Sequence, residues 1–381
     1  MENKRFKLKS VTVSGYRSYS SDREMTIDLG DVNLIIGANG AGKSNFISFL
    51  EMISYMATDG LSQFVGRNGF ARSLIYYGHS RASVSGRFQF GDGISEDTYS
   101  FAMEPAADGS LFISSETVLW QENREDTDTK PFVREFHGMG TTSALIGEEN
   151  EDRTAKAVLS FLRSFRVFHF NDSSINSAMR SPCYINDNRY LRSNAGNLAA
   201  FLYAIGQESG TRPYYQRIIR AIRSVMPRFD DFVLNPITYE GADARITLDW
   251  REKGSDEIFG PYQFSDGTIR FIALAALLLQ PEEKLPKVII IDEPELGLHP
   301  YAIHQLAALI RQASKFSQII VSTQSAEMLN EFDVNDVIVA EYDEQLHSSS
   351  LNRLSEEKLQ NWLEEYSLSE LWSKNIIGGT P

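Results

Sequence analysis

The spacing of hydrophobic residues at the amino end predicts three strands, a glycine-rich loop and a helix. Residues 8–13 and 25–29 alternate apolar and polar positions, and residues 32–36 form an apolar run bounded by Asp31 and Gly37. Period-two alternation is typical of half-buried strands, and a short apolar run of a fully buried one. Residues 46–53 then carry apolar side chains at helical spacing. We expect this organisation over about residues 1–80.

The middle of the chain, residues 81–260, has a different pattern. Residues 81–90, 98–103 and 111–120 alternate and are separated by turns that contain glycine or proline, which predicts an antiparallel meander. The polar residues 122–130 are expected to form a loop. Helices are expected at 153–165, 197–207 and 213–225, followed by strands at 232–239 and 244–250.

From residue 262 onward, helices and strands alternate again. Residues 268–279 predict an almost wholly apolar helix and residues 301–313 a second helix. Short apolar runs at 288–291, 318–322 and 337–340 predict strands. Continuous apolar strands between helices indicate a parallel sheet that is covered on both faces. The predicted fold class is α/β.

Composition places the chain among globular proteins, with 42% hydrophobic and 23% charged residues in a length of 381. The longest apolar run, residues 271–279, is far short of the ~20 residues needed to span a bilayer. The charged first residues lack the apolar stretch of a secretory signal, and Cys183 is the single cysteine. We expect a cytoplasmic protein. A net charge of −14 means that any nucleic-acid contact needs a local basic patch.

Residues 37–44, Gly-Ala-Asn-Gly-Ala-Gly-Lys-Ser, match the phosphate-binding loop G-x-x-x-x-G-K-[ST]. Glycines let backbone N–H groups surround phosphates, and the helix that follows adds its dipole. A chance glycine turn is the alternative, but this loop follows an apolar strand and opens a helix. The loop predicts ATP and Mg²⁺ as cofactors, with contacts from Gly37, Asn39, Gly40, Ala41, Gly42, Lys43, Ser44 and Asn45.

An apolar strand at 288–291 ends in two acids, Asp292 and Glu293. At the carboxyl edge of the sheet Asp292 can hold the Mg²⁺ shell with Ser44. Glu293, one residue later, points the other way and can orient or deprotonate an attacking water. A solvated acidic turn is the alternative, which the phosphate-binding loop upstream disfavours.

Between these two motifs, residues 264–268 read Phe-Ser-Asp-Gly-Thr and precede the apolar helix. The hydroxyl of Ser265, free N–H groups and the helix dipole all favour an anion. Plain N-capping explains the same residues when they are considered alone. Between the other two motifs, however, this stretch resembles the signature loop of ATP-binding cassette ATPases, and the resemblance favours anion binding by Ser265 and Gly267.

Residues 37–45, 265–270, 292–300 and 322–325 resemble the RecF/SMC branch of the ATP-binding cassette superfamily. They look most like compact ATPases related to the OLD (overcoming lysogenization defect) proteins of bacterial anti-phage defence. Asn45, Tyr-Arg-Ser-Tyr at 16–19 and Leu-Gly-Leu-His-Pro at 296–300 favour this branch over transporters. The resemblance implies a split P-loop domain with an antiparallel β-meander and an inserted lobe of helices and strands. Its parts would be an ATPase core of residues 1–80 and 261–345, an insertion of 81–260 and a helical tail of 346–381.

The resemblance also implies a homodimer with two composite ATP sites. Lys43, Ser44 and Asp292 of one subunit would hold ATP and Mg²⁺. The signature loop of the other subunit, with Ser265 and Gly267, would close over the γ-phosphate.

Other positions receive roles from the resemblance, and their alternatives remain open. Arg17 is a candidate ligand of nucleotide phosphate or an exposed arginine in a turn. His299 would lie at the dimer contact or serve a structural purpose. Gln63, Gln89 and Gln263 are the candidates for the glutamine that senses Mg²⁺.

Two positions depart from the family pattern. Gln324 stands where a switch histidine is usual, and an amide donates a hydrogen bond but carries no proton charge. We therefore expect slow hydrolysis, with Gln324 beside Glu293 as a catalytic residue. Asp266 stands where transporters have glycine, and its charge would repel a γ-phosphate unless it points away.

No long heptad arms separate residues 45 and 264, so we do not expect a true SMC protein. No TOPRIM-like set of acids is found after residue 342, so we expect no nuclease centre here. A separately encoded nuclease or toxin would be the effector partner, and no membrane contact is expected. Arg217, Arg220 and Arg223 follow one helix face, which either contacts nucleic acid or is a solvated face paired with acids. The functional hypothesis is a dimeric ATPase that gates an effector in DNA-related anti-phage defence. The alternative is the nucleotide-binding subunit of an ABC transporter.

Overall fold

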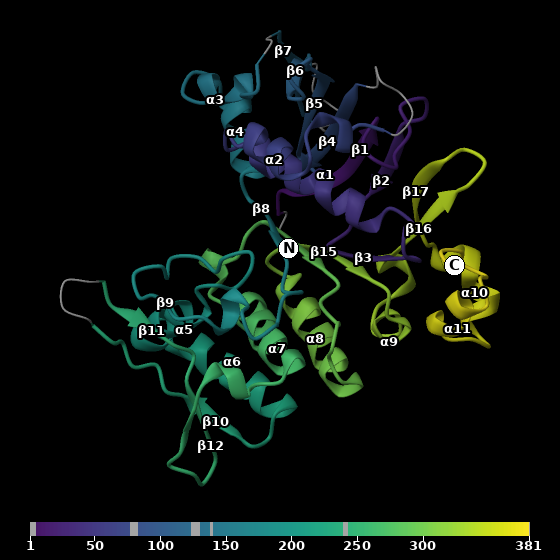
Figure 1. Cartoon of the computed structure of the whole chain (residues 1–381). Coiled ribbons are helices and arrows are strands. Elements are labelled where there is room, and N and C mark those ends of the chain that lie inside the picture. Colours follow the sequence, from purple (N-terminus) through teal and green to yellow (C-terminus); the bar gives the residue numbers. More distant parts are fainter. Residues whose placement is uncertain (1–4, 77–82, 123–129, 138–139, 239–242, 381) are drawn as a thin grey trace. The chain divides into compact units, whose positions relative to one another are not determined.

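The computed structural model describes residues 5–76, 83–122, 130–137, 140–238 and 243–380. It divides into two compact units, Met1–Arg166 with Asp333–Pro381, and Val167–Phe332 (Figure 1). Strand β8 (Phe165–Phe168) lies where the chain passes from the first unit to the second. Each unit contains helices and strands, in agreement with the predicted α/β class.

An antiparallel sheet in the order β2-β1-β4-β5-β6-β7 dominates the first unit. Its strands are β1 (Lys7–Ser14), β2 (Met25–Asp28), β4 (Val84–Gly91), β5 (Ser95–Pro105), β6 (Leu111–Glu122) and β7 (Phe132–Phe136). The alternating pattern predicted the meander, but it did not show that β1 pairs with β4. Strands on both sides of the expected boundary at residue 80 therefore share one sheet. Most of the loop expected at 122–130 lies outside the described residues.

Helix α1 (Lys43–Met56) packs on this sheet through buried aromatic rings. The ring centroid of Phe49 lies 5.9 Å from that of Phe88 and 6.1 Å from that of Phe101. Gly86 makes room for them, because a Cβ there would lie 2.7 Å from Phe49 and 2.6 Å from Phe101. The helix that follows the phosphate-binding loop is therefore held by the core of the meander.

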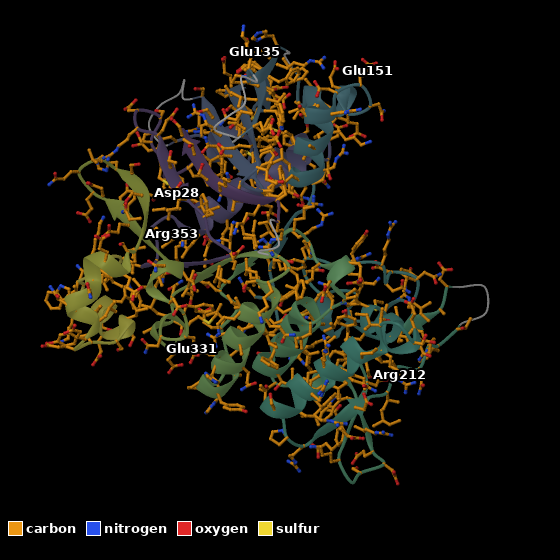
Figure 2. All side chains as sticks on the ribbon, turned by 180° about the vertical axis from the view of Figure 1, so that it is seen from behind. Asp28, Glu135, Glu151, Arg212, Glu331 and Arg353 are labelled. Carbon is orange, nitrogen blue, oxygen red and sulfur yellow. The ribbon has the colours of Figure 1, made fainter. Side chains whose placement is uncertain are left out.

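A second group of strands in this unit carries the phosphate-binding loop. Strand β3 (Val32–Ile36) is buried at every residue and pairs in parallel with β16 (Val337–Asp343). Strand β17 (Ser348–Arg353) pairs with β16 in the antiparallel sense. At its end Arg353 donates a 2.9 Å hydrogen bond to the carbonyl of Asp28 (Figure 2). The remaining helices of this unit are α2 (Leu61–Arg67), α3 (Ala144–Glu148), α4 (Arg153–Leu162), α10 (Glu356–Leu363) and α11 (Leu368–Ser373).

Helix α7 (Asp266–Leu278) is the centre of the second unit and is buried from Ile269 onward. It contacts α5 (Leu198–Gln207), α6 (Arg212–Val225) and α8 (Pro300–Ala313), which surround it in Figure 1. The parallel pair β14 (Val288–Asp292) and β15 (Gln318–Thr323) completes this part, and the short helix α9 (Ala326–Leu329) follows.

The strands expected at 232–239 and 244–250 are wrong in extent. The chain forms β10 (Phe229–Phe232), β11 (Arg245–Ile246), β12 (Trp250–Glu252) and β13 (Ile258–Phe259), and β11 pairs with β9 (Cys183–Tyr184). Pairing between distant residues sets these lengths, and alternation alone does not reveal it. Among the described residues, no helix has the length and apolar character to cross a membrane.

Asp97 in β5 gives a test of the meander core. Its side chain is buried, and its Oδ1 has no hydrogen-bond partner in the described structure. Burial, with the nearby charge of Asp92, raises the pKa of Asp97 from 3.8 to about 6. The stability that the protonated form provides is lost as pH rises through this range. We expect Asp97→Asn to raise the melting temperature at pH 8 by ~3 °C and to leave it unchanged below pH ~3.5. A variant that is no more stable than the wild type at pH 8 would contradict this.

Candidate functional site

The phosphate-binding loop has the backbone conformation that its glycines permit. Gly40 and Gly42 have φ angles of 83° and 107°, which favour glycine. A Cβ on Gly42 would lie 2.4 Å from the Oγ of Ser349, so no larger residue fits there. A Cβ on Gly40 would meet nothing within 4 Å. The loop is therefore packed against the protein at Gly42 and open at Gly40.

Lys43 is buried at the first turn of α1, and its Nζ donates to backbone carbonyls of its own loop. The distances are 2.5 Å to the oxygen of Gly37 and 2.9 Å to that of Ala38. Ser44 and Asn39 are exposed. An ammonium, an exposed hydroxyl and backbone N–H groups at the start of a helix suit an anion with associated Mg²⁺.

The Tyr-Arg-Ser-Tyr turn after β1 supports this loop from behind. Tyr19 donates through its hydroxyl to the carbonyl of Gly42 at 3.1 Å. Asn45 donates through Nδ2 to the Oγ of Ser18 at 2.8 Å. The sequence singled out Asn45 and this turn only as features that resemble a family. It gave no sign that the two are in contact. Hydrogen bonds between the turn and the loop hold Asn45 and Gly42 in place.

Arg17 in the same turn has a φ of 47° and points toward α2. Its Nη2 donates to the Oδ1 of Asn68 at 2.8 Å, and its buried Nε has no hydrogen-bond partner in the described part of the chain. Its proposed contact with phosphate stays a prediction.

A segment near the carboxyl end of the described chain also lies on the loop, and sequence reasoning missed it. The N–H of Ala38 donates to the carbonyl of Gly379 at 2.7 Å. A cavity of about 480 Å³ lies between residues 38–41, the end of β16 and this segment, with Tyr342 and Thr380 in its lining. The loop is therefore bordered by an open pocket on the Asn39 side.

The acids after β14 lie beside the end of β15. The register pairs Asp292 with Ser322, whose Oγ donates to the carboxylate of Asp292. Glu293 has a φ of 47°, and its carboxylate accepts a hydrogen bond from Nε2 of Gln324. The structure therefore brings together the predicted Mg²⁺ ligand, the predicted base and Gln324 within the second unit.

Glu295, which sequence reasoning did not select, is buried behind this cluster. Its Oε1 accepts from the hydroxyl of Thr323 at 2.5 Å and from the backbone N–H of Gln324 at 3.1 Å. Its Oε2 is buried without a partner in the described structure. Burial raises the pKa of this carboxyl. Glu295 thus anchors the residues that carry Gln324.

Ser265 begins helix α7 and is exposed. Its Oγ accepts from the N–H of Thr268 at 3.1 Å, which is the capping geometry considered as an alternative. Gly267 packs on the loop after β14, because a Cβ there would lie 2.1 Å from the carbonyl of Gly297. His299 caps α8, and its Nδ1 accepts from the N–H of Tyr301 at 3.3 Å.

The basic face on α6 is only partly free. Arg223 donates to the carbonyl and the carboxylate of Asp230, whereas Arg217 and Arg220 are exposed, as is Arg212 (Figure 2). Nucleic-acid contact there stays a prediction.

The three candidate glutamines occupy different elements. Gln89 accepts from Ser10 in the antiparallel sheet, Gln263 accepts from the N–H of Gly260, and Gln63 is exposed on α2. These positions do not favour one of the three glutamines as the residue that senses Mg²⁺.

Solved structures with the same arrangement of elements show which fold this is. The crystal structure of an SmcHead bound to the C-winged helix domain of ScpA matches with a TM-score of 0.57 at 16% identity, covering 92% of this chain and 99% of that one. An Smc head domain derived from Pyrococcus furiosus matches with a TM-score of 0.53 at 15% identity, covering 95% and 99%. The fold is that of an ABC-type ATPase head.

Sequence comparison then gives the family. Residues 32–330 match the model described as "AAA domain, putative AbiEii toxin, Type IV TA system", and the chain belongs to this family. Old nuclease of Escherichia phage P2 is 26% identical over 367 residues, which cover 85% of this chain and 57% of that protein. A Geobacter sulfurreducens protein described as an ABC transporter ATP-binding protein is 24% identical over 197 residues, 47% of this chain and 75% of that protein. The chain is an ATPase of the AAA/ABC type in the RecF/SMC/OLD branch, and it spans little more than half of Old nuclease.

Proposed function

We propose that the chain hydrolyses ATP as a dimer closed over two ATP molecules and thereby gates a partner effector. The observation that carries this proposal is the pair of anion-suited helix starts. Lys43 and Ser44 open α1 in one unit, and Ser265 and Gly267 open α7 in the other. Each of these is half of a triphosphate site, and two copies of the chain would complete both.

The residues present fit ATP with Mg²⁺. Lys43 would bind the β- and γ-phosphates, and Ser44 and Asp292 offer the oxygen ligands that Mg²⁺ prefers. Mg²⁺, when bound, would neutralise phosphate charge. Glu293 would orient the attacking water and accept its proton, while Gln324 holds the carboxylate of Glu293 in place.

The defence role rests on relatedness to Old nuclease of a phage and on a family described by a toxin name. Closing and opening would offer a separate nuclease or toxin a two-state signal. Arg217 and Arg220 are available for nucleic acid. A transporter role is the second candidate, and the similarity to a transporter ATP-binding protein supports it over 47% of the chain.

Glu293→Gln tests the proposal. The amide keeps the size of Glu293 but cannot accept the proton of water, so bound ATP would persist and the closed dimer with it. We expect the variant to elute as a dimer with ATP and Mg²⁺, and as a monomer with ADP. Hydrolysis should fall by about 100-fold or more. Size-exclusion chromatography with light scattering measures the mass.

Glu327→Gln, at an exposed position beyond the site, is the matched control and should behave as the wild type. A Glu293→Gln protein that stays monomeric with ATP and Mg²⁺ would overturn the proposed function.

A further inference from the structure

Arg180 is a buried arginine that sits directly under the signature loop. It ends a short turn (Ala178–Arg180) and is 4% exposed. Its Nε donates to the carbonyl of Ser173 at 3.0 Å. Its Nη1 donates to the carbonyls of Pro261 at 2.5 Å and Phe264 at 3.0 Å, and its Nη2 to the Oδ1 of Asp266 at 2.8 Å. Four acceptors surround one guanidinium.

These contacts hold the backbone before Ser265 and the side chain that follows it. The carbonyl of Phe264 precedes Ser265 and the carboxylate of Asp266 follows it, and one planar group holds both. A guanidinium presents its donors in a rigid fork, so the positions of its acceptors are set relative to one another. Ser265 itself stays exposed between them. The loop is therefore arranged before any ligand arrives.

Arg180 also offsets the negative charge of Asp266 beside the anion site. A carboxylate beside an anion site repels the anion, but here the carboxylate is ion-paired and tied to a buried cation. Removing Arg180 would take away the ion pair and the hydrogen bond of this carboxylate next to Ser265.

Two further contacts brace the same loop. Phe264 stacks on Trp250, with ring centroids 4.7 Å apart. Arg270, one turn into α7, is also buried and donates to the carbonyls of Phe170 and Asn171, both at 2.9 Å. Residues 170–180 thus form a strap that two buried arginines join to the start of α7.

We infer that Arg180 is a positioning residue that presents Ser265 and neutralises Asp266 for the γ-phosphate bound by a second copy of the chain. The inference rests on the proposed function and adds a residue from the strap to the site. Under the proposed function Ser265 contacts the nucleotide of the partner, so Arg180, which positions Ser265, serves that nucleotide and not the one bound by its own chain.

The test uses Arg180→Met and Arg180→Lys in the full chain, each also combined with Glu293→Gln. ATP should bind to the monomers with a Kd within about twofold of the parent, measured by calorimetry. ATP-dependent dimerisation should weaken at least about tenfold in both variants. Lysine keeps the positive charge but cannot donate to all four acceptors. Arg180→Lys therefore tests whether these hydrogen bonds position the signature loop, even if Arg180→Met does not fold. Arg212→Met, on an exposed position of α6, is the control and should dimerise normally.

Mixing the Arg180→Met and Lys43→Met proteins distinguishes a role of Arg180 in the ATP site of the partner from a general loss of folding or activity. A mixed dimer contains one intact site, built from the Lys43 loop of the first variant and the signature loop of the second. We expect ATPase activity to reappear on mixing, at about a tenth of wild type or more. No recovery by two folded proteins, or undiminished dimerisation of the Arg180 double variants, would overturn the inference. A Glu293→Gln protein that never dimerises would instead refute the proposed function, and this inference with it.

Discussion

Replacing Lys43 with methionine is expected to abolish ATP binding and hydrolysis while leaving the protein folded. The side chain is buried and held by the carbonyls of Gly37 and Ala38, so its ammonium is already placed at the head of α1. Methionine keeps the length of the side chain and removes the charge. Losing a desolvated ion pair with phosphate costs about 3–5 kcal/mol, which corresponds to a Kd raised by ~100-fold or more. Calorimetric titration with ATP measures this.

Lys156→Met is the matched control, because Lys156 is exposed on α4 and undergoes the same chemical change. It should bind ATP as the wild type does. A Lys43→Met protein whose Kd for ATP stays within threefold of the wild-type value would show that ATP does not bind at this loop. Circular dichroism and melting temperature would confirm that both variants remain folded.

The parts of the site that lie in short, ordered stretches of sequence could be predicted. Residues 37–44 need only local glycines before a helix, and Asp292 and Glu293 need only the end of an apolar strand. Helices α6 and α8 of the second unit followed from hydrophobic spacing, since each begins within one residue of the expected position. Family membership followed from the order of these motifs along the chain, because each motif is specific in its context.

The parts that depend on contacts between distant residues could not be predicted. Arg180 meets Asp266 across 86 positions, and no spacing rule relates the two. Likewise the carbonyl of Gly379 reaches Ala38 from the far end of the described chain. The sequence showed that the charge of Asp266 would repel a phosphate. It did not show that Asp266 forms an ion pair with a buried arginine, because that arginine lies in a stretch without a motif. Such residues become visible only when the fold brings them together.

Replacing Glu295 with alanine is expected to slow hydrolysis with little effect on ATP binding. Glu295 accepts from Thr323 and from the backbone of Gln324, whose side chain holds the carboxylate of Glu293. Alanine would remove the acceptor of the buried Thr323 hydroxyl, at a cost of about 1–3 kcal/mol, and that of the partly buried N–H of Gln324, and would release the loop that carries Gln324. We expect kcat to fall by ~10–100-fold, with KM for ATP within about twofold, in steady-state assays.

Glu295→Gln should separate the shape of this side chain from its charge. An amide keeps an acceptor for Thr323 and Gln324, so kcat should stay within about threefold of wild type. Burial raises the pKa of Glu295, so the stability given by its protonated form is present at low pH and lost as pH rises. The glutamine variant should therefore melt higher than wild type at pH 8 and equally below pH ~4. If Glu295→Gln slowed hydrolysis as much as Glu295→Ala, hydrogen bonding alone would not explain the role of Glu295. Its negative charge would then be required, and it would act through the neighbouring carboxylate of Glu293.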